Sequence, residues 1–348
     1  MLLVSFAVLL NFILLDKFTE ALYNSWSRYF SYYFNRDSAL YKFFMSMDED
    51  EFNNFINNIT AIIVYLFSFI IVYIVLIFFL RRASVKTDTY IQNRVSFKFR
   101  LPENTAALVI LGIAIVYACV LLSWVFDVFL GFFGIEKIEF DTPAFPKTVY
   151  GVILYFAASV IAPAFLEEFF CRYLILNSLK KYGGKFAIIV SAVFFGFLHG
   201  RTPAIFFAAA IGIYSAYIAL KTKSIWFSII LHAAVNLLSV IWHYISELPF
   251  LTDEMFDILF WCFSAAIYLF SFVYLIILAK NKSRKSLSLP KHRDYVYMSR
   301  GRKVIMFFNV VTIIFLFLAI LQAAQEYAMP MFSGGSGFGE LSVFRFVR

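Results

Sequence analysis

Long apolar segments alternate with short polar ones along most of the chain. A transmembrane helix needs about 20 predominantly apolar residues, because each residue adds about 1.5 Å and the hydrocarbon layer is about 30 Å thick. Residues 59–80, 106–130, 255–279 and 304–324 meet this requirement clearly. The stretch 148–244 predicts four further spans. The pattern therefore predicts an all-α polytopic membrane protein.

A shorter apolar run occupies residues 1–15. It lacks the basic segment and the small-x-small cleavage site that mark a signal peptide, so we interpret it as an uncleaved anchor. With this run the prediction is nine transmembrane helices, and with the run re-entrant or removed it is eight. No internal repeat or soluble domain is visible in the sequence. We therefore divide the chain into an N-terminal transmembrane region (1–147), a central core (148–244) and C-terminal transmembrane helices with a tail (245–348).

Charges between the spans predict their orientation, because Lys and Arg collect in cytoplasmic loops. Basic residues fill segments 81–100 and 280–303, and lysines mark two shorter connections at 180–185 and 221–223. Acidic residues mark the segments 48–51 and 136–141. The signs alternate along the chain, which predicts that the basic connections and the N-terminus lie inside.

The composition is that of a membrane protein, and it excludes several kinds of partner and site. The chain of 348 residues is 62% hydrophobic and 15% charged, whereas soluble domains are about one-quarter charged. The net charge of +8 is explained by the cytoplasmic loops, so we expect no nucleic-acid partner. Cys119, Cys171 and Cys262 stand apart without CxxC spacing, which indicates neither a disulfide framework nor a thiolate metal site.

Three charged residues interrupt the first predicted span of the central core. Glu167, Glu168 and Arg172 follow Pro163 within this span, and ionisable residues inside a membrane are costly and often functional. Residues four apart share a helix face, so Glu168 can pair with Arg172 while Glu167 points elsewhere. That arrangement would leave the Glu167 carboxylate available for chemistry. A buried packing network without chemistry is the alternative.

The next spans add two histidines and an asparagine. His199 ends the run Phe195-Gly196-Phe197-Leu198-His199, and Asn236 lies one helical turn after His232. An intramembrane histidine on its own is often an interhelical hydrogen-bonding group. However, Glu167, His199 and Asn236 each lie 13 or 14 residues, about 20 Å, from a lysine at the inner end of the helix, with His232 at about 14 Å. This agreement favours one polar site inside the bundle.

The motifs Glu167-Glu168-x-x-x-Arg172, Phe195-x-x-x-His199 and His232-x-x-x-Asn236 together resemble the signature of the CAAX protease and bacteriocin-processing family (CPBP), also called the Abi family. The resemblance covers residues 148–244. It implies an intramembrane endopeptidase, in which Glu167 and His199 activate a water while His232 and Asn236 stabilise the oxyanion. Glu168 and Arg172 would orient these groups.

The sequence leaves metal dependence open. Glu167, His199 and His232 could supply the three ligands of a catalytic zinc with an open water position, although the chain has no HExxH motif. Both a metalloprotease and a metal-free glutamate mechanism are proposed for the family. We favour the metal-free mechanism, because His232 and Asn236 suit a pair of hydrogen-bond donors better than a ligand set. Cys171 is four residues after Glu167, whose carboxylate would oppose thiolate formation, so we interpret Cys171 as a packing residue.

The sequence therefore predicts a CAAX-type intramembrane protease whose partners are membrane lipid and a peptide substrate, including lipidated peptides. The alternative is a non-proteolytic binding or bacteriocin-immunity protein that uses the same polar layer. The sequence carries no retention or lipidation motif, so we take a bacterial cytoplasmic membrane as the default location.

Overall fold

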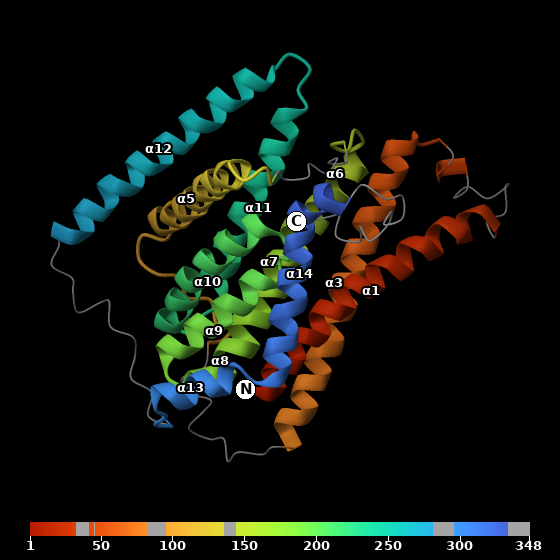
Figure 1. The fold of residues 1–348 in the computed structure, drawn as a ribbon. Helices are drawn as coiled ribbons and strands as arrows, with labels where there is room; N and C mark the ends of the chain where they lie inside the picture. Colours follow the sequence, from red (N-terminus) through yellow and green to blue (C-terminus); the bar gives the residue numbers. More distant parts are fainter. Residues whose placement is uncertain (33–41, 45, 83–94, 136–143, 281–295, 333–348) are drawn as a thin grey trace.

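The computed structural model describes residues 1–32, 42–44, 46–82, 95–135, 144–280 and 296–332 of the chain. These residues form an assembly of helices, as the apolar pattern predicts (Figure 1). The long helices outside the central core are α1 (Leu2–Tyr32), α3 (Glu49–Arg82), α5 (Thr105–Gly131), α12 (Asp253–Lys280) and α14 (Val310–Phe332). The predicted acidic segment 136–141 and much of both long basic loops lie outside the described residues.

Six helices of the described part are long and apolar enough to cross a membrane, or seven if one bent pair counts as a single span. This number is below the predicted eight to nine. Two of the predicted spans account for much of the difference, because their apolar helical segments, Leu2–Leu15 and Gly184–Phe197, are too short to meet the requirement. A helix of 14 residues is about 21 Å long, which falls short of the hydrocarbon thickness.

The predicted span 304–324 is not one continuous helix, because the chain bends by 60° between α13 (Arg300–Phe307) and α14. Asn309 begins the new helix by accepting a hydrogen bond from the backbone N–H of Thr312 at 3.2 Å. The Asn309 amide also donates to Ser5 Oγ of α1 at 3.0 Å, and Ser5 and Thr312 share a 2.6 Å hydrogen bond. An asparagine cap inside an apolar run thus ends one helix and starts the next.

The central core contains the four predicted helical segments. The first extends from Val149 to Tyr182, and it is followed by α9 (Gly184–Phe197), α10 (Thr202–Thr222) and α11 (Trp226–Ser246). Helix α9 turns back into α10 at Gly200, whose φ of +65° favours glycine. A Cβ on Gly196 would lie 2.8 Å from the Ile205 carbonyl oxygen, so this glycine lets the two helices pack closely. The hairpin consequently places His199 in the interior of the protein.

Segments that carry the predicted inside charges meet at one end of the bundle. The Ser96 backbone N–H donates to the Lys223 carbonyl at 3.1 Å, and the Val296 N–H donates to the Lys181 carbonyl at 2.9 Å. Asn177 binds both backbone groups of Val95, at 3.0 and 2.9 Å. These contacts bring the described parts of the four basic connections, 81–100, 180–185, 221–223 and 280–303, to the same end of the bundle. The charge pattern predicts the same, since it places all four on one side of the membrane.

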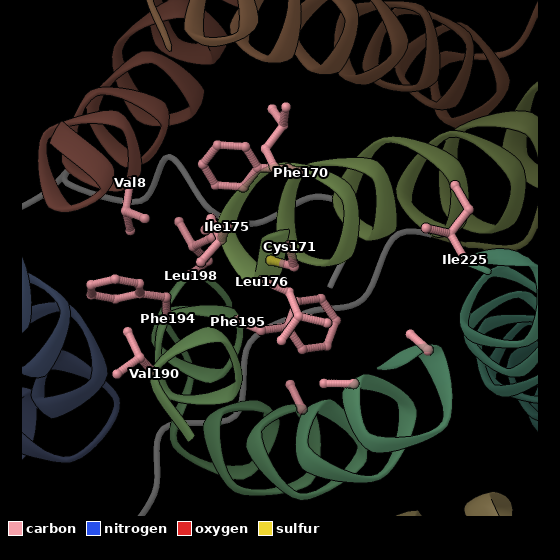
Figure 2. Close-up of a cluster of buried hydrophobic side chains, with 14 of the residues drawn as sticks. Val8, Phe170, Cys171, Ile175, Leu176, Val190, Phe194, Phe195, Leu198 and Ile225 are labelled. Atoms are coloured by element: carbon pink, nitrogen blue, oxygen red, sulfur yellow. The ribbon is translucent and has the colours of Figure 1, made fainter. Parts of the chain in front are cut away.

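The apolar core surrounds the helix that carries the two glutamates. Figure 2 shows Cys171 of this helix on the side of Phe195 of α9 and Phe170 on the other side, with Phe194 of α9 and Val8 of α1 in the same cluster. Cys171 is fully buried there, in agreement with its interpretation as a packing residue.

Candidate active site

Glu167 and Glu168 lie where the first core helix changes its winding. The α-helical pieces α6 (Val149–Phe156), α7 (Ala162–Glu168) and α8 (Leu176–Leu179) are separated by π-helical turns at Ala157–Ile161 and Phe169–Ile175, and a 3₁₀ turn at Lys180–Tyr182 follows. Short π-helical segments are rare and are frequent at functional sites. Glu167 and Glu168 end α7 with 4% and 1% exposure, and Arg172 in the second π-helical turn is fully buried.

Glu168 and Arg172 form the pair that their spacing predicts. Arg172 Nε lies 3.0 Å from Glu168 Oε2, and the guanidinium also donates to Ser215 Oγ of α10 at 2.7 Å. The Arg172 guanidinium carbon stands 4.6 Å from the centre of the Phe195 ring. The buried guanidinium thus compensates the charge of Glu168 and links α7, α9 and α10.

Glu167 has its two carboxylate oxygens directed to different helices. The Tyr65 hydroxyl of α3 donates to Oε1 at 3.2 Å, and His199 Nε2 at the end of α9 lies 3.9 Å from Oε2. The carboxylate is therefore separate from the Glu168–Arg172 pair, as the helix geometry predicts. A distance of 3.9 Å exceeds a direct hydrogen bond, yet one water oxygen can reach both atoms at hydrogen-bond distance.

The ring orientation of His199 is fixed by α9, which ends two residues before it. His199 Nδ1 lies 2.8 Å from the Phe195 carbonyl oxygen. A carbonyl only accepts, so Nδ1 carries a proton, and the ring in its neutral form presents an acceptor at Nε2, toward Glu167. The Phe195 ring contacts both histidines, with centroid distances of 4.9 Å to His199 and 5.6 Å to His232.

His232 faces Glu168 rather than Glu167. Its Nδ1 lies 3.2 Å from Glu168 Oε1, and the ring is 9% exposed. The three proposed metal ligands, Glu167, His199 and His232, therefore do not converge. Within the described ranges, no group of three or more His, Cys, Asp and Glu side chains has the arrangement of a metal site. The donor set does not fit a catalytic zinc with three protein ligands.

Asn236 binds the backbone of the first core helix. Its Nδ2 donates to the Ser159 carbonyl at 2.9 Å. This carbonyl would bond to the N–H of residue 163 in a regular α-helix, but residue 163 is a proline and has no N–H. Asn236 thus donates to a backbone acceptor to which Pro163 cannot bond. The amide retains a second N–H for another acceptor.

Sequence reasoning missed three partners of the site. Tyr65 and Ser215 contact Glu167 and Arg172 across helices, and Ser159 contributes only a backbone oxygen. Neither Tyr65 nor Ser215 stands near a charged motif in the sequence. Pro163, however, was a usable signal, since a proline cannot bond the carbonyl four residues before it and thereby leaves room for another donor.

The comparisons with known proteins concern this central segment. Residues 149–238 match the family model "Type II CAAX prenyl endopeptidase Rce1-like". The chain is also 32% identical over 110 residues to "Putative membrane peptidase YdiL" of Bacillus subtilis, an alignment that covers 31% of this chain and 45% of that protein. The chain therefore spans less than half the length of this relative. No solved structure matches the chain significantly.

Proposed function

We propose that this chain is an intramembrane endopeptidase, because residues 149–238 match the model of the Rce1-like, type II CAAX prenyl endopeptidase family. The observation that carries the proposal is the placement of Glu167 against His199, in the interior of the bundle. A carboxylate and a neutral imidazole acceptor that face each other across 3.9 Å can hold one water between them. The substrate is a membrane-associated or lipidated peptide.

In the proposed reaction, Glu167 takes a proton from this water while His199 Nε2 accepts the hydrogen bond from its other O–H. The resulting hydroxide attacks the scissile carbonyl carbon and forms a tetrahedral oxyanion. The proton then passes from Glu167 to the leaving amide nitrogen as the C–N bond breaks, which yields a carboxylic acid and an amine. Atoms and charge balance without any further reactant.

His232 and Asn236 are the proposed oxyanion donors. Since Nδ1 of His232 is engaged with Glu168, Nε2 is the nitrogen that donates, and this role requires the doubly protonated ring. Asn236 donates through the N–H that Ser159 does not use. Donors fixed in a water-poor interior stabilise a developing oxyanion strongly, and removal of one donor costs about 100- to 1,000-fold in rate.

The test compares the wild-type protein with Glu167→Gln, purified in detergent, against a library of hydrophobic and prenylated peptides followed by mass spectrometry. We expect the wild-type to cleave at least one peptide and the variant to lose cleavage, because an amide cannot accept the proton from water. Glu254→Gln makes the same chemical change at an exposed position and should cleave as wild-type does.

A chelator arm tests the metal question in the same assay. We expect cleavage to continue in EDTA, since the three proposed ligands do not converge on one point. Equal cleavage by wild-type and Glu167→Gln would contradict the proposal. Binding of a peptide without cleavage by either protein would favour a non-proteolytic binding or immunity role for the same polar groups.

A further inference from the structure

We propose that Tyr65 of α3 is a positioning residue for Glu167, so that the active site extends beyond the segment 149–238. The inference rests on the proposed peptidase function and adds a residue to it. Tyr65 lies in the N-terminal region, 102 positions before Glu167, and its hydroxyl donates to Glu167 Oε1 at 3.2 Å. Its side chain is buried, with 5% exposure.

The Tyr65 ring is held in place by aromatic contacts that connect α3 to the glutamate helix. It stacks on Phe69 with centroids 5.9 Å apart and an interplanar angle of 5°. Phe69 in turn meets the edge of Phe170 at 5.6 Å, and Phe170 lies three residues after Glu167. The hydroxyl therefore keeps a defined position relative to the carboxylate, because the two helices share this packed contact.

A second contact fixes α3 to the same helix nearer its N-terminal end. Glu51 in the first turn of α3 accepts a hydrogen bond from the Lys147 N–H at 3.0 Å and another from the Thr148 hydroxyl. Thr148 is the N-cap of α6 and accepts from the Gly151 N–H. Fourteen residues, about 21 Å, separate Glu51 from Tyr65 along α3, so the glutamate helix is braced at two levels.

The chemical consequence concerns rotation of the Glu167 carboxylate. Terminal sp² groups of glutamate rotate in a broad, roughly two-fold manner. A phenolic O–H directed at Oε1 restricts this rotation and keeps Oε2 directed at His199, where the proposed water is deprotonated. The bond also replaces solvation that a buried carboxylate loses. Tyr65 acts through Glu167 and need not touch the substrate.

The substitution Tyr65→Phe tests this role, since it keeps the ring on Phe69 and removes only the O–H. With a peptide that the wild-type cleaves, we expect kcat to fall by about 10- to 100-fold with KM nearly unchanged, because supporting residues that fix a reacting group have effects of this size. The thermal unfolding midpoint should stay close to that of the wild-type. Tyr73→Phe is the matched control, because Tyr73 lies on the same helix and packs on Phe169 at 5.3 Å.

A wild-type kcat in Tyr65→Phe, together with inactive Glu167→Gln, would overturn the inference and leave the proposed function intact. A raised KM at unchanged kcat would assign Tyr65 to substrate binding, and a large loss of thermal stability would assign it to packing. Both results would also overturn it. If no peptide is cleaved, infrared difference spectra against Glu167→Gln isolate the Glu167 carboxyl band. Tyr65→Phe should shift this band, and an unchanged band would contradict the hydrogen bond.

Discussion

At the scale of single residues, two adjacent glutamates have different surroundings. Glu167 faces a tyrosine and the imidazole of His199, whereas Glu168 faces an arginine and His232. Adjacent positions on a helix diverge by about 100°, which is why one backbone segment can supply two separate environments. The compensated glutamate is the proposed orienting group, and the other is the proposed base.

The contribution of the Glu168–Arg172 pair to stability can be measured by removing one charge or both. Arg172→Met leaves the carboxylate of Glu168 buried without its main countercharge, and loss of one partner of a buried pair destabilises by about 3–5 kcal/mol. The double variant Glu168→Gln with Arg172→Met removes both charges and keeps an acceptor for His232. We expect its thermal unfolding midpoint in detergent to lie above that of Arg172→Met.

Arg300→Met is the control for this comparison, because Arg300 is exposed at the start of α13. It should unfold at the wild-type temperature. A double variant that is as unstable as Arg172→Met would mean that the hydrogen bonds of the guanidinium, rather than the countercharge, dominate its contribution.

At the scale of elements, the sequence predicts a helix correctly where the helix is one uninterrupted apolar segment of membrane-spanning length. The spans 59–80, 106–130 and 255–279 all lie within helices of the expected kind. Periodicity could not reveal that α9 stops in the interior, because that end depends on the left-handed backbone of Gly200. It could not reveal that Asn309 divides the last span either, because Asn309 has its partner on another helix. The two π-helical turns next to the glutamates likewise leave no mark in the hydrophobic pattern.

The same distinction applies to the candidate site. The spacing of charged residues was sufficient to pair Glu168 with Arg172 and to bring Glu167 near His199. It placed His232 with Asn236 as donors but did not foresee that Glu168 binds one and the Ser159 carbonyl the other. Depth along a helix limits which residues can meet, whereas helix rotation and packing decide which do.

We expect substitutions of Pro163 and Asn236 to have coupled effects on stability. Asn236→Leu leaves the Ser159 carbonyl without this donor, which costs about 1–3 kcal/mol for a buried polar group. Pro163→Ala restores an N–H on the first core helix, so the double variant should recover part of that stability, with a coupling of about 0.5–3 kcal/mol. Thermal unfolding of the two single variants and the double variant measures the coupling.

The same variants separate two roles of Asn236. If Asn236 also donates to the oxyanion, the double variant should regain stability while cleavage stays about 100- to 1,000-fold below that of Pro163→Ala. Full return of cleavage would assign Asn236 to the backbone alone. If the double variant changed the unfolding free energy by the sum of the two single changes, Asn236 would not compensate for the N–H that Pro163 lacks.

At the scale of the whole molecule, the two ends of the bundle differ in their chemistry. One end gathers Ser96, Lys181, Lys223 and Val296 through backbone hydrogen bonds, and in the sequence these residues belong to lysine- and arginine-rich connections. The other end holds Asp48 and Glu51 beside the backbone and side chain of Lys147 and the hydroxyl of Thr148. The positive-inside rule then predicts that the first end faces the cytoplasm and that α3 enters the membrane from the opposite side.

Cysteine labelling in intact cells tests this orientation. The background carries Cys119→Ser and Cys262→Ser and keeps Cys171, which is fully buried. Lys98→Cys then reports the basic end and Lys147→Cys the opposite end, since both positions are exposed. We expect a membrane-impermeant maleimide to label Lys147→Cys in intact cells and Lys98→Cys only after permeabilisation. The background protein alone should stay unlabelled. The reverse pattern would invert the bundle, place the first turn of α9 on the outer side and contradict the predicted orientation.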